Sequence, residues 1–179
     1  MKRVMVDLET MGIQKDAVIL SIGAVEFDHV RGYSAHKFYQ NVDPDSCLAV
    51  GMSISQHTVE FWGRPEQAAA REFLQKDMLP IADALLAFRS WILRDTNHDE
   101  IEMWCNGMFD LPILETAYLY TKLPHPWRFF NERDFRTMKM MWQQVPKPKF
   151  EGVKHSALAD AVHQAEHLIA ILKHIGWTG

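Results

Sequence analysis

The sequence predicts an α/β domain with a mixed β-sheet and helices packed on it. Three observations support this fold class. Strand-like segments dominate the first 42 residues, amphipathic helical stripes fill the middle of the chain, and a further buried strand is followed by more helices. Such an order of elements is typical of a mixed sheet flanked by helices. The chain has 179 residues, which suits one domain, so we expect a single domain over residues 1–179.

The opening strands are predicted from their side-chain patterns. Residues 3–9 alternate between apolar and polar side chains, and residues 18–27 are apolar and rich in β-branched side chains. Residues 33–42 follow the turn signal Arg31-Gly32. A period of two with β-branched residues favours strands, so the three segments predict a β-meander.

The middle of the chain is predicted to be helical. Residues 55–62 are predicted to form one short helix, and residues 64–66 begin a second whose apolar side consists of Ala68, Phe73 and Leu74. A third helix follows, because apolar residues at helical spacing form a stripe over residues 81–93.

The second half mixes strands and helices. Residues 101–105 are predicted to form a buried strand that leads through Asn106-Gly107 into a helix from about Asp110. Residues 127–131 are predicted to form a short strand. Asp134 is expected to cap a helix that runs to about residue 143.

The last helix is predicted over residues 156–175, with Ser156 as its N-cap. We expect His163, His167 and His174 on its surface, because none of them belongs to an acidic motif. The expected core face consists of Leu158, Val162, Ala165, Ile169 and Leu172.

Composition excludes several classes of protein. The cysteines, Cys47 and Cys105, lie far apart without a metal-binding spacing, which indicates a reducing compartment. The start of the chain lacks the apolar core of a signal peptide, and no apolar run approaches the roughly 18 residues of a membrane span. We therefore expect a cytoplasmic protein without membrane contact. The net charge of −4 argues against a duplex-coating protein, so nucleic-acid contact should be local, metal-bridged and confined to a chain end.

Three segments carry the residues that a metal-dependent nuclease needs. They are Asp7-Leu8-Glu9, Asn106 to Asp110, and His155 to Asp160. The period of a strand places Asp7 and Glu9 on one face, with Cα atoms roughly 6.6 Å apart. A histidine in an exposed loop suits a general base, because its usual pKa is about 6.5. If the fold brings the segments together, four carboxylates and one imidazole share a cleft.

Each of these residues also has an ordinary structural explanation. Asp7 and Glu9 could be a solvent-facing acidic pair, and Asp110 could favour the helix macrodipole. His155 is one of nine histidines. Their joint occurrence favours the functional interpretation, because Mg²⁺ and Mn²⁺ prefer carboxylate and phosphate oxygens. Two such ions roughly 3.5–4 Å apart can stabilise an in-line displacement at phosphorus, so we expect two Mg²⁺ or Mn²⁺ ions.

The three motifs resemble those of the DEDDh 3′–5′ exonuclease superfamily, which includes polymerase proofreading subunits and oligoribonucleases. They occur in the family's order and span residues 7–160. The resemblance implies a ribonuclease-H-like fold with a central mixed sheet flanked by helices. It also implies a metal-dependent enzyme that hydrolyses phosphodiester bonds at the 3′ ends of single-stranded RNA or DNA, or of short oligonucleotides, and releases 5′-mononucleotides. The residues that it assigns are Asp7, Glu9, Asp110 and Asp160 as metal ligands, direct or through water, and His155 as the catalytic base.

A finer similarity links residues 18–24 and the short chain to a subgroup of small bacterial and phage exonucleases. Some members are described as exoribonucleases similar to a mycobacterial RNA-trimming enzyme, and others carry an exodeoxyribonuclease VIII label. The residues do not choose between RNA and DNA, because a 2′-hydroxyl contact is a single hydrogen bond. Relatives that act alone often form dimers, so we expect a homodimer.

Substrate contacts are inferred from position in the motifs. In the superfamily, the backbone after the glutamate of the first motif contacts the terminal sugar. Gly12 lies at that place and, without a side chain, would let the sugar approach the backbone closely. An aromatic side chain such as Trp62 could stack on a base or lie in the core. Asn106 could satisfy a turn, and Phe109 could belong to the core. The expected substrate-binding residues are Thr10, Met11, Gly12, Trp62, Asn106 and Phe109.

Basic side chains near the motifs have two interpretations. Arg133 and Arg136 could meet phosphate, or they could be solvated or paired beside Asp134. The loop before His155 carries the best basic cluster for steering phosphate, although loop lysines usually serve solubility. Its members are Lys147, Lys149 and Lys154.

Two other functions make different demands on the sequence. A retired nuclease that only binds nucleotides, nucleic acid or a partner predicts that at least one site residue is replaced, whereas all five are present. A nuclease of this fold that cuts internally predicts carboxylates without the histidine motif. The chain has no G-x-x-x-x-G-K motif, so a nucleoside triphosphatase has no support.

Overall fold

The computed structural model describes residues 1–152 and 155–178, and its centre is a five-stranded mixed sheet. The strand order is β3-β2-β1-β4-β5. Strand β2 pairs antiparallel with β1 and β3, whereas β4 lies parallel to β1 and β5. The strands are β1 (Lys2–Thr10), β2 (Ile19–Asp28), β3 (Gly32–Asn41), β4 (Ile101–Cys105) and β5 (Glu132–Asp134). The predicted mixed sheet is confirmed.

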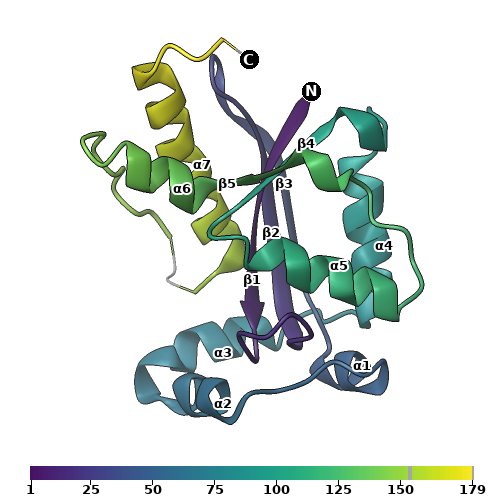
Figure 1. Cartoon of the computed structure of the whole chain (residues 1–179). Helices are drawn as coiled ribbons and strands as arrows, with labels where there is room; N and C mark the ends of the chain where they lie inside the picture. Colours follow the sequence, from purple (N-terminus) through teal and green to yellow (C-terminus); the bar gives the residue numbers. More distant parts are fainter. Residues whose placement is uncertain (153–154, 179) are drawn as a thin grey trace.

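Helices cover both faces of the sheet. Figure 1 shows α4 and α5 on one side, α6 and α7 on the other, and α1, α2 and α3 gathered near the end of β1. In the described part of the chain, no helix is long and apolar enough to cross a membrane. The helices are α1 (Pro44–Ala49), α2 (Gln56–Gly63), α3 (Ala68–Leu74), α4 (Ile81–Ile92), α5 (Asp110–Tyr120), α6 (Phe135–Met141) and α7 (Ala157–His174).

The side chains of β1 alternate between two apolar layers. Val4, Val6 and Leu8 are buried in the larger cluster, to which α4 and α5 contribute. Met5 is buried in the second cluster, to which α6 and α7 contribute. Asp7 and Glu9 follow Met5 on the same face, because side chains of a strand alternate with a period of two. The strand therefore turns both carboxylates toward the α7 side of the sheet.

Helix α7 packs very closely on the sheet at Gly23. This glycine lies opposite Asp7 in the β1–β2 ladder. A Cβ added at Gly23 would overlap the backbone of Ala157 and Leu158, the first residues of α7. Only glycine permits such an approach of two backbones. The first turn of α7, which contains Asp160, therefore lies beside Asp7.

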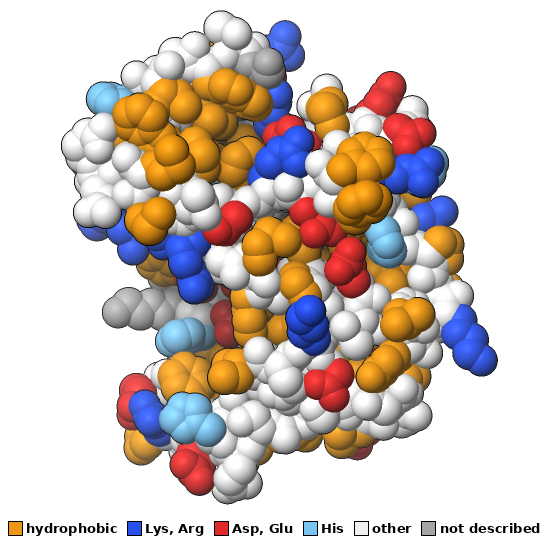
Figure 2. Space-filling model, in the orientation of Figure 1, with side chains coloured by type: hydrophobic (Ala, Val, Ile, Leu, Met, Phe, Trp, Pro, Cys, Tyr) orange, Lys and Arg blue, Asp and Glu red, His pale blue; other side chains and the backbone are white. Residues whose placement is uncertain are grey.

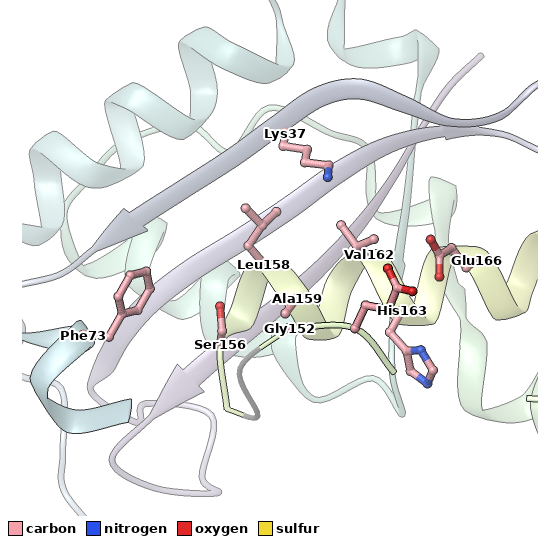
Figure 3. A pocket seen from close by; sticks show the side chains of 10 residues that line it. Lys37, Phe73, Gly152, Ser156, Leu158, Ala159, Val162, His163 and Glu166 are labelled. Atoms are coloured by element: carbon pink, nitrogen blue, oxygen red, sulfur yellow. The ribbon is translucent and has the colours of Figure 1, made fainter. Parts of the chain in front are cut away.

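The core face of α7 agrees with the predicted one only in part. Ala165, Ile169 and Leu172 are buried as predicted, whereas Leu158 and Val162 are half-buried. In the first turns, Ala157 and Ala161 are buried instead. The side chains of Leu158 and Val162 line a cavity of about 360 Å³ between α7 and β3 (Figure 3). The prediction favoured the large apolar residues, but small alanines are what allow the helix to approach β2.

Two of the three histidines expected on the surface of α7 are buried. His163 is 7% exposed and His167 is 5% exposed, so the prediction is wrong for them, while His174 is exposed as expected. The His163 ring packs edge-on against Phe150, and the His167 ring against Phe135. Burial, the largest cause, lowers the pKa of both histidines, which keeps them in the neutral form that a core tolerates.

Two further expectations are wrong in detail. Residues 127–131 form no strand: a 3₁₀ turn covers Phe129–Asn131, and β5 follows it. Trp127 is buried in the larger cluster, whereas Phe129 and Phe130 are exposed, so the apolar side chains of this segment do not indicate a strand. In α3, Ala68 and Phe73 are exposed, since this short helix buries only Ala70 and Leu74.

Replacing Gly23 is expected to detach α7 from the sheet. Gly23→Ala should lower the free energy of unfolding by about 1–3 kcal/mol, because the new methyl group meets helix backbone that cannot move alone. Urea unfolding followed by circular dichroism measures this. Gly63→Ala is the matched control, because nothing lies within 4 Å of a Cβ added there, and its change should stay within about 0.5 kcal/mol. Equal destabilisation of both variants would contradict the close packing of α7.

Candidate active site

Four acidic residues from three segments meet at the end of β1. Asp7 and Glu9 come from β1, and Asp160 comes from the first turn of α7. One carboxylate oxygen from each of these three residues lies within 4.8 Å of the other two. Asp110 begins α5, and its Oδ1 accepts a hydrogen bond of 2.9 Å from the backbone N–H of Leu8. The fold therefore brings the four predicted carboxylates together.

Asp110 reaches β1 because β4 runs parallel to β1 and the chain turns sharply after it. Gly107 and Met108 both have positive φ angles, 93° and 49°. The backbone N–H of Gly107 donates a 2.7 Å hydrogen bond to Asp134, which also caps α6 through Arg136 N–H and Thr137 N–H. The turn that aims Asp110 is thus held by the start of α6.

Burial and mutual repulsion raise the pKa values of these acids. Burial, followed by repulsion from Asp110, Glu9 and Asp160, raises the pKa of Asp7 well above its usual value. Burial, Asp160 and Asp110 raise the pKa of Glu9 to about 8. Burial also raises the pKa of Asp110 to about 7. Burial raises the pKa of Asp160 as well, and His155 partly offsets this increase. Full ionisation of such a cluster requires positive charge beside it.

The donor set fits a hard divalent cation. Asp7, Glu9 and Asp160 offer only carboxylate oxygens, which are the ligands that Mg²⁺ and Mn²⁺ prefer. A cation would also offset the repulsion that raises the pKa values of Asp7 and Glu9. These three residues would hold a metal ion, with Asp110 beside them.

His155 stands just before α7 on a strained backbone. Its φ angle is 59°, in the left-handed region that non-glycine residues rarely adopt. The imidazole packs edge-on against the rings of Phe61 and Trp62, with centroids 5.3 Å and 6.1 Å away. The backbone N–H of His155 hydrogen-bonds to the Asp160 carboxylate. Strain of this kind clusters at functional sites, but the role of His155 as the base stays a prediction.

A cavity of about 260 Å³ adjoins Glu9 on the α2 side. Four of the expected substrate-binding residues line it: Thr10, Gly12, Trp62 and Phe109. The motifs did not reveal the α2 residues that complete its wall, because only the packing of α2 beside β1 places them there. They are His57, Thr58 and Phe61.

Trp62 has a clear structural role in the wall of this cavity. It is only 4% exposed, and its indole N–H donates a 2.9 Å hydrogen bond to the carbonyl of Thr10. The Thr10 hydroxyl donates to the carbonyl of Gly12 at 2.7 Å. The first bond joins α2 to the end of β1, and the second holds the turn that follows β1. The burial of Trp62 agrees with the predicted core alternative. Stacking of Trp62 on a base stays a prediction.

The other two expected substrate-binding residues lie outside the cavity wall. Met11 lines a neighbouring apolar cavity and packs against the buried clusters. Asn106 lies in the turn after β4, where its carbonyl accepts a hydrogen bond of 3.3 Å from Arg136. Their contacts with substrate stay predictions.

The predicted basic residues separate into two groups. Arg133 is paired, because its guanidinium lies 3.8 Å from Glu102 and donates to two backbone carbonyls. Lys149 is exposed, and Lys154 lies outside the described residues. Arg136 and Lys147 lie close enough to the acids to influence them, since Arg136 lowers the pKa of Asp110 and Lys147 that of Asp160.

Comparison with known proteins identifies the family. The model of the 3′–5′ exoribonuclease Rv2179c-like domain matches residues 2–172. This chain belongs to that exoribonuclease family. No curated protein matches it.

Solved structures show that the exoribonuclease has the fold of DEDDh nucleases. The nuclease domain of 3′hExo, a DEDDh family member bound to rAMP, has a TM-score of 0.60 at 15% identity, covering 97% of this chain and 92% of that one. Exonuclease X in complex with 5′-overhanging duplex DNA has a TM-score of 0.60 at 18% identity, covering 98% and 94%. Apo Exonuclease I has a TM-score of 0.66 at 13% identity, covering 96% and 42%. The predicted ribonuclease-H-like fold and the DEDDh resemblance are confirmed.

Gln164 contacts the acidic cluster of the candidate site, and the motifs did not reveal it. Its Nε2 donates a 2.7 Å hydrogen bond to Oδ1 of Asp7. The side chain is buried on the sheet-facing side of α7, about one turn after Asp160. Such a bond orients a ligating carboxylate and tunes its metal affinity. A glutamine on a helix core face was the available signal, but the predicted face did not include it.

Removing the Gln164 amide should weaken metal binding without unfolding the protein. Gln164→Leu keeps a similar volume but loses the bond to Asp7, so we expect Mn²⁺ affinity to fall about 10–100-fold. Isothermal titration with MnCl₂ measures this. Gln143→Leu is the control, because exposed Gln143 donates only to the carbonyl of Met140. Unchanged Mn²⁺ affinity in Gln164→Leu would refute the positioning role.

Proposed function

We propose that this exoribonuclease hydrolyses phosphodiester bonds at the 3′ ends of single-stranded RNA and releases 5′-mononucleotides, with two Mg²⁺ or Mn²⁺ ions. The observation that carries the proposal is the convergence of Asp7, Glu9 and Asp160 within 4.8 Å beside a cavity that Glu9 also lines. RNA is favoured over DNA because the matching family is one of exoribonucleases.

The proposed roles follow from the position of each side chain. When bound, the metal ions activate water and stabilise charge on the attacking and leaving oxygens. Asp7, Glu9 and Asp160 would hold the ions together with Asp110, and Gln164 orients Asp7. His155 accepts the proton of the attacking water at a ring nitrogen, and the hydroxyl oxygen bonds to phosphorus. The bond between phosphorus and the 3′ oxygen of the penultimate nucleotide breaks. That oxygen takes up a proton from solvent, and His155 returns its proton to solvent.

The cavity beside Glu9 supports attack at a chain end rather than internally. Phe61 and Trp62 of α2 form one wall of it, and the Trp62 indole N–H is hydrogen-bonded to the carbonyl of Thr10 at the end of β1. The terminal nucleoside lies in this cavity, so its phosphate lies at the carboxylates. A homodimer stays a prediction that sedimentation equilibrium would test.

Removing a central carboxylate should abolish trimming. Asp7→Ala and Asp160→Ala are each expected to lower kcat by roughly 10²–10³-fold or more, because a cation loses a direct ligand. A short 5′-labelled RNA in Mg²⁺ or Mn²⁺ reports 3′ trimming as a ladder, and chromatography identifies the released 5′-mononucleotides. Glu66→Ala, at an exposed acid, is the control and should trim like the parent. Parental trimming by Asp7→Ala, or cleavage of a circular RNA by the parent, would overturn the proposed function.

Without metal, stability should fall as the pH rises. The pKa in the folded protein is about 8 for Glu9 and about 7 for Asp110, against about 4 when unfolded. Their protonated forms stabilise the folded state fully below about pH 4, and this contribution is lost as the pH rises toward 8. We therefore expect the free energy of unfolding in EDTA to decrease from pH 5 to pH 8. Mn²⁺ should offset the decrease, because it binds the folded state.

Urea unfolding at several pH values, with EDTA or MnCl₂, tests this expectation. The comparison is the double variant Asp7→Asn with Glu9→Gln, which removes two of the repelling charges and should flatten the dependence in EDTA. Stability that increases from pH 5 to pH 8 in EDTA for the parent would contradict the electrostatic account.

A further inference from the structure

Three cationic side chains around α6 stand together beside the active site. The Arg136 guanidinium lies against Gly107, where an added Cβ would overlap it, and it donates to the carbonyl of Asn106 at 3.3 Å. Lys139 Nζ lies 3.5 Å from the Asn106 side-chain oxygen. Lys147, in the loop after α6, and Arg136 are the charges that repel Lys139. We call Arg136, Lys139 and Lys147 the α6 cations.

The α6 cations differ from most other basic residues near the sheet. Arg3, Arg94 and Arg128 are each paired with a carboxylate. Among the residues that the structure describes, no ion pair joins Arg136, Lys139 or Lys147 to an acid.

Asp134 acts on Lys139 electrostatically, but among the described residues it forms no ion pair with the α6 cations. The Asp134 carboxylate accepts from backbone N–H groups of Gly107, Arg136 and Thr137 and from the Thr137 hydroxyl. Burial, Arg136 and Lys147 lower the pKa of Lys139. A partly buried cation among like charges is unfavourable unless an anion compensates it.

The α6 cations lie across the carboxylates from the cavity on the α2 side. Arg136 contacts Gly107 and Lys139 contacts Asn106, in the turn that leads into Asp110. Arg136 also acts electrostatically on Asp110, and Lys147 on Asp160. The cavity opposite is lined by Phe61 and Trp62 of α2, and α2 and α6 stand at opposite sides of the end of β1 (Figure 1). Figure 2 shows a hollow on this side of the molecule, with Lys and Arg side chains at the edge that the α6 region forms.

We propose that Arg136, Lys139 and Lys147 bind the backbone phosphates of the RNA on the 5′ side of the scissile bond. The inference rests on the proposed function, and it specifies the direction of the strand: the 3′ nucleoside lies toward α2, and the upstream chain crosses toward α6. Arg136 suits bidentate contact with a phosphate, whereas Lys139 and Lys147 act as point charges. The site binds phosphate and not base, so it increases the affinity for longer RNA without a preference for sequence.

The proposed site is tested directly by how kcat/KM depends on the length of the RNA. A dinucleotide has only the scissile phosphate, whereas an eight-nucleotide RNA also reaches the α6 cations. We define the length preference as kcat/KM for the eight-nucleotide RNA divided by kcat/KM for the dinucleotide. Lys139→Met and Lys147→Met keep the apolar stem and remove the charge. Each is expected to lower the length preference several-fold, and a variant with both changes and Arg136→Met at least tenfold.

Salt dependence provides a second readout of the same interaction. The slope of log(kcat/KM) for the eight-nucleotide RNA against log[KCl] should become less negative by about 0.7 for each phosphate that a variant no longer neutralises. Lys173→Met is the control, since it changes the net charge equally at an exposed position in the last turn of α7. It should change neither the length preference nor the salt slope.

Three outcomes separate the inference from the function on which it rests. Equal loss of activity on both RNAs, with an unchanged length preference, would mean that the cations serve only the carboxylates, and it would overturn the inference. Equal effects of Lys139→Met and Lys173→Met would overturn it as well. A parent that trims neither RNA refutes the proposed function. Anisotropy of the 5′-labelled eight-nucleotide RNA, measured in Ca²⁺, still decides the inference then, because weaker binding by the triple variant alone supports it and equal binding overturns it.

Discussion

The close contact between α7 and β2 at Gly23 is the constraint on which the active site depends. Asp7 and Glu9 need only the alternation of a strand to share a face. Asp160 lies more than 150 residues later, and it joins them because the backbone of α7 can touch the sheet where Gly23 has no side chain. The same approach turns Gln164 onto Asp7. Local geometry supplies the first pair of acids, the packing of α7 supplies Asp160, and the turn after β4 supplies Asp110.

The electrostatic cost of this packing has a functional meaning. Carboxylates that are buried together raise each other's pKa values, and a cation bound among them would offset that repulsion. Within residues 1–152 and 155–178, the α6 cations form no ion pair with an acid, and the nearby acids repel one another. The α6 cations favour an anionic ligand, and the acids favour a cationic one. A phosphodiester chain with bound metal ions offers both, with the metal ions at the acids and the phosphates at the α6 cations.

Sequence patterns predicted the parts of the protein that depend on local order. The alternation of β1, the strand at residues 101–105 and the helix from Asp110 are where the patterns expected them. The acidic motifs identified the residues that converge, because chemistry restricts which side chains can hold hard cations. The family match and the DEDDh fold agree with that interpretation.

The features that sequence patterns missed are set by tertiary packing. In the first turns of α7, alanines and Gly23 rather than Leu158 and Val162 decide which face meets the sheet, which hid Gln164. Arg133 lies 3.8 Å from Glu102 and pairs with it. Among the described residues, Arg136 has no such ion pair with Glu102. The periodicity of side chains along the sequence does not predict such distances between segments.

Anomalous diffraction from a crystal soaked in MnCl₂ tests the central claim most directly. The account predicts a manganese peak within about 2 Å of carboxylate oxygens from Asp7, Glu9 and Asp160, with Gln164 still bonded to Asp7. Manganese bound elsewhere on the protein while these three acids hold none would contradict it.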